Sequence, residues 1–179
     1  SVSGLAKAEQ PQILPNHWTC SSDMIISIVN ECDKEGYMPL LLVGDESEPM
    51  IRRYIDRSEL YAGFIDNRVV AVCAVTCEGD GRYEVKNLAV EAVFRRKGIG
   101  RAMLEYVETL HPGSVILLGT GENPATLGFY MKSGYEYSHT VADFFVDNYP
   151  YPIIENGVVL RDMIYLSKHT YPKKQALIL

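Results

Sequence analysis

The spacing of apolar residues predicts two helices in the first third of the chain. From Ser22 to Gly36 the apolar positions recur three and four residues apart, as on one helical face, and Gly36 fits a helix end. This face would comprise Ile25, Ile28, Val29 and Cys32. A second helix is expected after Ser47, with an apolar stripe of Met50, Ile51, Tyr54 and Ile55. Between the two helices, the apolar run at 39–43 fits either a loop or a strand.

Three extended segments follow, at 60–65, 69–77 and 82–91. Turn-forming residues separate them, Asp66-Asn67 in the first break and Gly79, Asp80 and Gly81 in the second. Short breaks of this kind join neighbouring antiparallel strands. The three segments should therefore form an antiparallel meander.

The third extended segment changes its hydrophobic phase along its length. Its apolar residues move from Tyr83 and Val85 to Leu88 and Val90, so the spacing of two is broken once. One extra residue that bulges out near Asn87 would explain the change. A strand buried on both faces would show the same pattern without a bulge, so both interpretations stay open.

The second half of the chain alternates helices and strands. The clearest element is the helix at 99–110, whose apolar residues keep helical spacing while its charged residues face outward. A strand at 114–120 follows, and then a helix with Asn123 as its N-cap and Gly134 just past its end. Two further strands are expected, near 135–140 and 158–167.

This order of elements predicts an α/β chain of the α+β kind, with a mixed, mostly antiparallel central sheet. About six or seven strands would be flanked by about four helices, and one β-α-β step would make a single strand pair parallel. A single domain is expected at 20–167, because no linker or repeat interrupts this stretch. Residues 1–19 would form an N-terminal tail or edge strand, and 168–179 a C-terminal tail.

Composition narrows the classes of function. The 179 residues are 47% hydrophobic and 22% charged, which is ordinary for a globular protein, and the formal net charge of −6 argues against a nucleic-acid binder. No apolar run approaches the roughly 20 residues of a membrane helix, so a cytoplasmic protein without a membrane partner is expected. Four scattered cysteines do not suggest a disulfide framework. His17 and Cys20 lack a second pair of ligands, so no metal is expected.

Positive charge nevertheless gathers at one strand-to-helix turn. Four cations fall within seven positions: Arg95, Arg96, Lys97 and Arg101. Gly98 and Gly100 lie among them, and the N–H groups at the start of a helix attract anions. The pattern indicates a diphosphate site, although a tight turn with solvated cations is the simpler alternative. A dinucleotide fold is set aside, because its third glycine is replaced by Met103.

At this turn the chain resembles the GNAT family of N-acetyltransferases. The family's coenzyme motif, [Q/R]-x-x-G-x-[G/A], is matched by Arg95, Gly98 and Gly100, and the resemblance in element order covers about residues 20–167. The segments 85–90 and 123–135 are similar to the family's two core motifs. Further likeness points to a little-characterised bacterial subgroup, part of which carries an indole-3-acetic acid acetyltransferase label. That likeness lies in Leu40, Leu41, Leu42 and Asp45, in Gly119-Thr120-Gly121, and in residues 154–157 and 161–164.

The resemblance implies acetyl-CoA as co-substrate and assigns roles to particular residues. Coenzyme contacts would come from Leu88, Ala89, Val90, Arg95, Arg96, Lys97, Gly98, Ile99, Gly100, Arg101 and Asn123. The backbone at 88–90 would pair with the pantetheine arm and polarise the thioester carbonyl. Thr126 stands where the family usually has alanine, which bears on the fit of the adenosine end.

Two residues are expected to handle protons. Tyr130 would protonate the departing thiolate as a general acid, although it also fits a core aromatic. An attacking amine with a pKa near 10.4 must lose a proton, and Glu84 is the candidate base that acts through water. Glu84 equally fits a solvated strand residue.

The acceptor is expected to be a primary amine of a small molecule, attacked directly in a ternary complex. The aromatic and acidic segment at 142–152 would suit a cationic or aromatic amine, or equally the contact of a homodimer. Two alternatives remain, a non-catalytic acyl-CoA sensor and an acyltransferase that uses another acyl-CoA.

Overall fold

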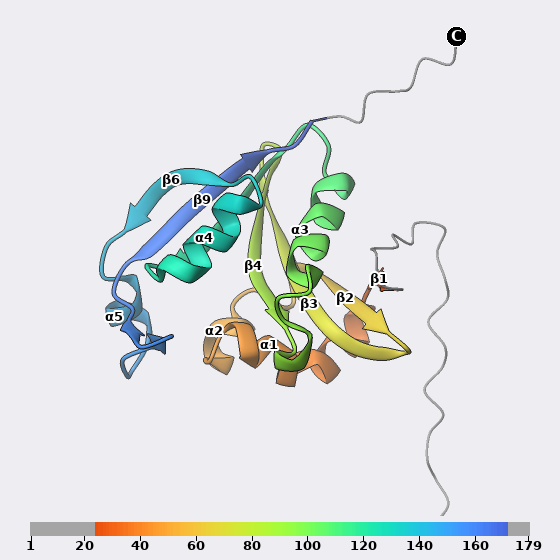
Figure 1. Ribbon diagram of the computed structural model, residues 1–179, viewed down its shortest axis with the longest axis horizontal. Helices are drawn as coiled ribbons and strands as arrows, with labels where there is room; N and C mark the ends of the chain where they lie inside the picture. Colours follow the sequence, from red (N-terminus) through yellow and green to blue (C-terminus); the bar gives the residue numbers. More distant parts are fainter. Residues whose placement is uncertain (1–23, 172–179) are drawn as a thin grey trace, which may run out of the picture.

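A computed structural model describes residues 24–171 of the chain (Figure 1). The tail or edge strand expected at 1–19, with His17 and Cys20, lies outside these residues, as do residues 172–179. The first half contains β1 (Ile25–Ile28), the 3₁₀ helix η1 (Glu31–Tyr37), α1 (Met38–Gly44), α2 (Glu48–Arg52), β2 (Ser58–Ile65), β3 (Arg68–Gly79) and β4 (Arg82–Val90). The second half contains η2 (Ala92–Phe94), α3 (Ile99–Leu110), β5 (Val115–Gly121), α4 (Pro124–Lys132), β6 (Glu136–Val141), α5 (Phe144–Asn148), β7 (Ile154–Glu155), β8 (Val158–Val159) and β9 (Met163–His169).

Seven strands form one sheet in the order β1-β2-β3-β4-β5-β9-β6, and β7 and β8 pair separately. Every neighbouring pair in the large sheet is antiparallel except β4 and β5, which are parallel. The helix α3 makes this parallel connection. The expected class, a mixed and mostly antiparallel sheet with flanking helices, is confirmed, with five α-helices among the described residues.

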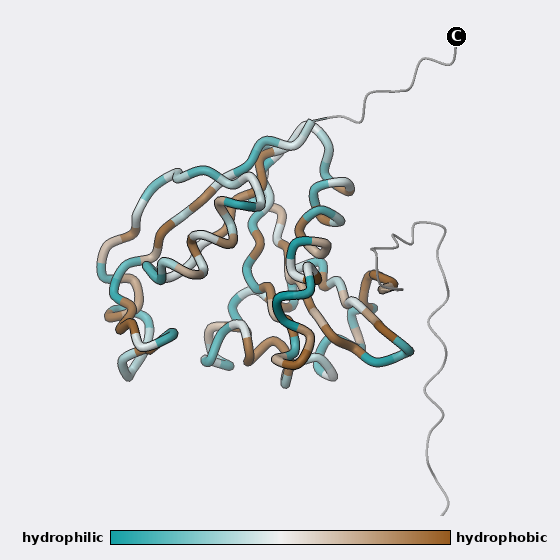
Figure 2. Tube along the Cα trace, in the orientation of Figure 1, coloured by the Kyte–Doolittle hydropathy of each residue, from teal (hydrophilic) through white to brown (hydrophobic). Residues whose placement is uncertain are grey.

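The strand β3 separates two hydrophobic cores because its successive side chains point to opposite faces. Cys73 and Val75 join the core under α3 and α4, whereas Val72 and Ala74 join the core under α1 and α2. Residues 70–76 are all buried. Figure 2 shows the hydrophobic colour along the central strands, while β6 is mostly neutral or hydrophilic. The two faces of the sheet are therefore covered by different helices.

The helix expected from Ser22 to Gly36 is wrong. Residues 25–28 form the edge strand β1, paired with β2 from Ile25 opposite Phe64 to Ile28 opposite Tyr61, and η1 follows. Ile26 is 1% exposed, whereas Ile25 and Ile28 are 43% and 46% exposed. Alternate burial is the pattern of a strand, and the pairing with β2 overrides the local helical spacing.

The run at 39–43 is neither a loop nor a strand but the centre of α1. Pro39 lies in the first helical turn, where its missing N–H costs no hydrogen bond. Leu41 is fully buried against the sheet. An apolar run without periodicity does not distinguish a buried helix from a strand.

The strand expected at 158–167 is divided in two. β8 ends at Val159, β9 begins at Met163, and Leu160 lies between them with its side chain against Gly121. A Cβ at Gly121 would collide with Leu160, so this glycine allows the close approach. β9 continues to His169, two residues beyond the expected end of the domain.

Candidate active site

A bulge interrupts β4 at the position that the hydrophobic phase change indicated. Ala74 of β3 lies opposite Asn87, but the next residue, Val75, lies opposite Val85, so Lys86 is the extra residue. Val85 and Leu88 consequently face the same core, although three positions separate them. The bulge is thus confirmed.

Beyond the bulge, β4 and β5 separate. They pair only from Arg82 opposite Val115 to Val85 opposite Leu118. After that point β4 stays with β3, while residues Gly119 to Gly121 stay with β9. Figure 1 shows β4 and β9 diverging from the end where the sheet is closed. This separation leaves one edge of β4 unpaired from residue 86 onward within the described part of the chain.

The backbone groups of Leu88 and Val90 face this unpaired edge. The N–H of Glu91 donates to Val70 O at 2.9 Å, on the β3 side. Backbone groups alternate in direction along a strand, so those of Leu88 and Val90 point away from β3. Those of Ala89 point toward β3, and its side chain is buried under α1. The N–H and C=O groups of Leu88 and the N–H group of Val90 are therefore open to a ligand, while Val90 O accepts from Arg95.

The four predicted cations are all exposed at the end of β4 and the start of α3. Arg95 Nε donates to Val90 O at 3.0 Å, and the Lys97 ammonium lies 5.2 Å from the centre of the Phe94 ring. Arg101 pairs with Glu105 one turn further along α3. Within residues 24–171, Arg96 makes no hydrogen bond or ion pair through its side chain. The cations are available to an anion from solvent.

The two glycines of the motif have different functions. Gly98 has φ 82°, in the left-handed region, and turns the chain into α3. A Cβ at Gly100 would lie 3.3 Å from the Phe129 ring and 3.7 Å from Val90, so this glycine lets α3 approach α4. The first turn of α3 contains no acidic residue, and Ala102 N–H makes the first helical bond, to Gly98 O. The preceding N–H groups can therefore bind an anion.

Asn123 caps α4 and also attaches the β7–β8 hairpin to it. Its Oδ1 accepts from the N–H groups of Ala125 and Thr126 at 2.9 and 3.4 Å, and its Nδ2 donates to Glu155 O at 2.8 Å. Thr126 Oγ1 donates to a Glu155 carboxylate oxygen. Asn123 is 2% exposed, and both its amide oxygen and its amide nitrogen make hydrogen bonds, which fix it at the start of α4.

Tyr130 lies on α4 with its ring in the core and its hydroxyl unbonded. The ring is 5.0 Å from Phe129 and 6.3 Å from Tyr135, centre to centre. Burial, and secondarily the nearby Cys73 and Glu155, raise the pKa of the phenol well above its usual value. None of the hydrogen bonds within residues 24–171 uses this hydroxyl. The side chain is a core aromatic that also keeps a proton to donate.

Glu84 lies on the opposite face of β4 from the core that holds Tyr130. Its carboxylate accepts from Lys86 Nζ at 2.8 Å, with side-chain exposures of 14% and 23%. Tyr165 lies nearby on β9. Its burial, and secondarily the charge and hydrogen bond of Glu84, raise the pKa of its phenol to about 12. Glu84 is thus a paired carboxylate beside the bulge and not a solvated strand residue.

A second polar cluster, which the sequence analysis did not assign to the site, lies on that same face. Asn87 Nδ2 donates to Leu41 O at 2.9 Å and to Tyr54 Oη at 3.0 Å. The Tyr149 hydroxyl donates to Asp45 Oδ1 at 3.0 Å. Tyr149 belongs to the aromatic segment that the sequence singled out, but its partner is 104 residues away. Local spacing could not connect them.

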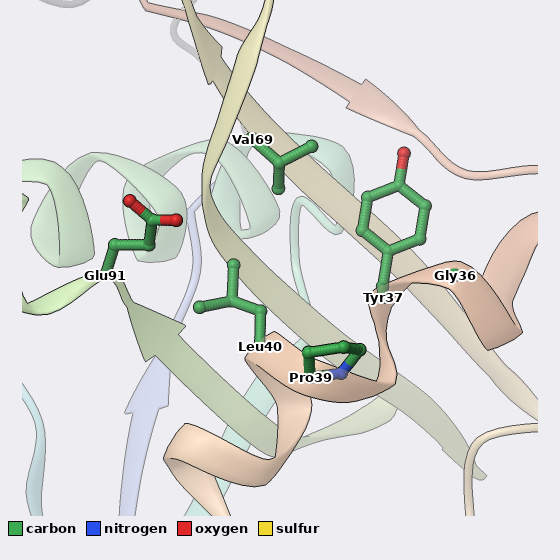
Figure 3. Close-up of a pocket in the computed structure, with 6 residues that line it drawn as sticks. All are labelled: Gly36, Tyr37, Pro39, Leu40, Val69 and Glu91. Atoms are coloured by element: carbon green, nitrogen blue, oxygen red, sulfur yellow. The ribbon is translucent and has the colours of Figure 1, made fainter. Parts of the chain in front are cut away.

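A cavity of about 210 Å³ lies on this side of the sheet, beyond the end of β4. Figure 3 shows Tyr37, Pro39 and Leu40 around it, with Val69 and Glu91 opposite. It contains none of the predicted site residues, although Glu91 directly follows Val90. The candidate active site is accordingly an open edge in the sheet and not this hollow.

The described residues were also compared with the requirements of a metal site and of a membrane-spanning helix. Across 24–171, no three histidine, cysteine or acidic side chains are close enough to hold a metal ion. No helix in the same stretch has the length and hydropathy required to span a membrane.

Comparison with known proteins identifies the class. The family model described as an acetyltransferase (GNAT) domain matches residues 56–137. The chain is 30% identical over 145 residues to the uncharacterized N-acetyltransferase YvbK of Bacillus subtilis, which covers 79% of this chain and 93% of YvbK. The chain belongs to the GNAT family of N-acetyltransferases, and the resemblance predicted from its motifs is confirmed.

Solved structures agree with this assignment. An IAA acetyltransferase from Bacillus cereus has a TM-score of 0.76 and 31% identity over 82% of this chain and 99% of its own. A GNAT acetyltransferase from Elizabethkingia anophelis with acetyl-CoA bound has a TM-score of 0.73 and 30% identity, over 82% and 97%. A Bacillus subtilis acetyltransferase in complex with CoA has a TM-score of 0.71 and 27% identity, over 80% and 97%.

Proposed function

We propose that the chain transfers an acetyl group from acetyl-CoA to a primary amine of a small molecule. The observation that carries the proposal is the unpaired edge of β4 beyond Lys86, which ends at the cationic turn before α3. An extended ligand with an anionic end fits this arrangement, because the strand edge offers backbone groups and the turn offers positive charge. The similar structures with acetyl-CoA or CoA bound support the same donor.

The coenzyme would be held at two places. Its pyrophosphate would bind the free N–H groups of Ile99, Gly100 and Arg101 together with the side chains of Arg96 and Lys97. Its pantetheine arm would bind the backbone of Leu88 and Val90 as an additional strand. Arg95 holds Val90 O and would keep the corner between these two places in shape.

The reaction would be a direct attack in a ternary complex. The neutral amine nitrogen forms a bond to the thioester carbon, and the carbonyl oxygen becomes negative and accepts from Leu88 N–H. The C–S bond then breaks, the attacking nitrogen loses one proton to a base or to solvent, and the thiolate takes the Tyr130 proton, which solvent later replaces. The products are an amide and free CoA. Tyr130 holds this proton at neutral pH, and because burial raises the pKa of its phenol, the phenolate formed on donation would recover a proton readily.

Two predicted residues would act in supporting positions. Asn123 would set the direction of α4, and through it the position of Tyr130, because both ends of its amide are engaged. Glu84 remains a proposed base, but its carboxylate already faces the Lys86 ammonium at 2.8 Å. Because of this pairing, the acceptor amine would have to compete with Lys86 for the Glu84 carboxylate.

Calorimetry with acetyl-CoA, followed by a thiol-release assay, tests the function. We expect binding, and CoA release with at least one class among polyamines, aminoglycosides, amino acids, aromatic amines and peptide N-termini. Binding without release from any amine would favour the sensor alternative, and faster release from propionyl- or succinyl-CoA would favour another acyl donor. Absence of binding would exclude the proposal altogether.

A pair of charge variants tests the position of the pyrophosphate. Arg96→Gln removes a cation that has no partner in the part of the chain that the structure describes, and we expect several-fold weaker acetyl-CoA binding in calorimetry. Lys132→Gln, an equally exposed cation at the end of α4, is the matched control. Equal effects of the two variants would indicate attraction by overall charge rather than a site at Arg96.

A further inference from the structure

The carboxylate of Asp45 is held beside the bulge of β4. Asp45 directly follows α1, and the preceding Gly44 packs so closely on Asn87 Oδ1 that a Cβ at 44 would collide with it. Asn87 is the first residue after the bulged Lys86. The chain is thus fixed to the strand one residue before Asp45.

One oxygen of this carboxylate is anchored and the other is free. Oδ1 accepts from Ser47 N–H at 3.1 Å and from the Tyr149 hydroxyl at 3.0 Å. Within residues 24–171, Oδ2 takes part in no hydrogen bond or ion pair and is not enclosed. Two donors on one oxygen fix the orientation of the group, so the second oxygen is presented in a defined direction.

The Asp45–Tyr149 bond also connects the two diverging parts of the molecule. Asp45 follows α1 beside β4, whereas Tyr149 follows α5, which comes after β6. A second link joins Arg53 Nη1 to Asn148 Oδ1 at 3.1 Å. The carboxylate therefore lies where the first half of the chain meets the second, on the face of the sheet opposite Tyr130.

We infer that Asp45 binds the ammonium group of the acceptor through its free oxygen and takes the proton that the nitrogen loses as it attacks. The acceptor would then be a cationic primary amine. The inference rests on the proposed acetyl transfer and adds its acceptor side. The ammonium loses one proton to Asp45, the nitrogen forms the C–N bond, the C–S bond breaks, and CoA leaves with the Tyr130 proton. The nitrogen loses its second proton to solvent as the amide forms, and solvent then removes the proton from Asp45 and returns one to Tyr130.

Asp45 suits this role better than Glu84 because of their partners. Glu84 faces a lysine, so its charge is already compensated, whereas Asp45 is held by a hydroxyl and an amide, which leave its negative charge in place. Partial burial raises the pKa of Asp45 above the usual aspartate value, against the opposing effect of the Ser47 and Tyr149 donors. A raised pKa makes a carboxylate a stronger base.

The charged and titratable groups near Asp45 are few. Glu46 on its own segment adds negative charge, Tyr54 of α2 and Tyr149 are phenols whose pKa values burial raises, and Arg53 contributes positive charge near Tyr149. Both phenols stay neutral at pH 7. Glu46 is exposed, so solvent screens its charge, and the local charge that an incoming ammonium meets is set mainly by Asp45.

The test compares Asp45→Asn with Glu46→Gln in the full chain, using the amine class that the wild type acetylates. Asparagine can still accept from Ser47 and Tyr149, so the fold should be retained, and equal melting temperatures and acetyl-CoA affinities check this. We expect kcat/KM at pH 7 to fall at least about tenfold in Asp45→Asn and to stay within about twofold in Glu46→Gln. The deficit should shrink as the pH approaches the pKa of the amine, near 10.4 for an alkylamine, because solvent then removes the proton.

The possible outcomes are distinguishable. An unchanged kcat/KM in Asp45→Asn overturns the inference but not the acetyl transfer, and so does an equal loss at every pH in both variants. No thiol release by the wild type removes both proposals. Tyr149→Phe is the second variant: it frees Oδ1 while the charge stays, so a smaller loss than in Asp45→Asn with the wild-type pH profile supports the inference. A lowered melting temperature with unchanged kinetics in both Asp45→Asn and Tyr149→Phe would overturn the inference and show that the Asp45–Tyr149 bond is purely structural.

Discussion

The half of the sheet that β1 to β4 form differs from the half that β5, β9 and β6 form in how far helices cover it. In β3, seven consecutive residues at 70–76 are buried, because helices lie on both faces. In β6, at the opposite edge, all six residues are exposed. The covered half contains the larger part of the buried core and the strand edge at which we propose that the coenzyme binds. The open half leaves room on the face where the acceptor would bind.

The halves meet at a closed end and separate at an open end. At the closed end β4 and β5 pair directly, and at the open end side-chain contacts such as Tyr149 with Asp45 join the first and second halves. Such contacts can change without altering either core. We therefore expect stability to depend on the covered half and acceptor choice on the contacts between the halves.

The largest effect should come from a core truncation in the covered half. Leu60→Ala removes a fully buried side chain from β2 and should lower the free energy of unfolding by about 2–5 kcal/mol, through lost burial and a cavity. The matched change in the open half, Val141→Ala, affects a β6 residue that is 39% exposed and should cost less than about 1 kcal/mol. Urea unfolding measures both, and similar losses would contradict the division between the halves.

The second largest effect should be on the rate of catalysis, at the place where β4 and β5 separate. Tyr130→Phe keeps the ring in the core but removes the proton donor, so kcat should fall about a hundredfold, which is about 2.7 kcal/mol in the barrier. Acetyl-CoA affinity and melting temperature should not change, because the hydroxyl has no hydrogen-bond partner among the described residues. Tyr137→Phe, on the exposed strand β6, is the control and should keep full activity. A wild-type rate in Tyr130→Phe would remove this residue from the mechanism.

A smaller effect distinguishes the helix caps of the two halves. Asn123→Ala removes the cap of α4 and its bond to Glu155, and should cost about 1–2 kcal/mol of stability. Ser47→Ala removes only a 3.4 Å bond to Met50 N–H at the start of α2, and should cost about 0.5–1 kcal/mol. Asn123→Ala should also lower kcat, since α4 carries Tyr130. Unchanged turnover would show that α4 keeps its place without this cap.

The smallest effect is a pH dependence at the closed end. His111, after α3, stacks on Tyr83 at 3.8 Å, and burial lowers the pKa of its imidazole, although Glu59 opposes this. The folded state therefore binds a proton less readily than the unfolded state. Stability is fully present above the unfolded pKa of about 6.5 and declines as the pH falls toward the folded value. In urea unfolding between pH 7 and 5, His111→Gln should flatten this dependence, and an identical slope would assign it to other groups.

The sequence predicted the segments whose signals are local. The bulge in β4 was one of the two interpretations that the phase change between Val85 and Leu88 allowed, and α4 followed from its cap at Asn123 and its stop at Gly134. Both signals lie within a few residues of what they describe. The parallel pairing of β4 with β5 also followed, because an intervening helix permits little else.

Contacts between distant segments could not be predicted in this way. The apolar spacing at 25–32 fitted a helix, but pairing with β2 made residues 25–28 a strand, and nothing local reports that pairing. The Asp45–Tyr149 bond could not be predicted for the same reason, since periodicity carries no information across 104 residues. The candidate donor site was therefore predictable in advance, and the acceptor side was not.

Because β4 contains a single extra residue, the fold should tolerate a substitution at this position better than an insertion or a deletion. Replacing Lys86 would alter one side chain, whereas deleting it would move residues 82–85 by one step and turn Val85 out of the core. An insertion elsewhere in β4 would do the same to Leu88. Homologous chains that keep this architecture should accordingly vary in residue type at position 86 but not in the number of residues between the β3–β4 turn and the cationic loop.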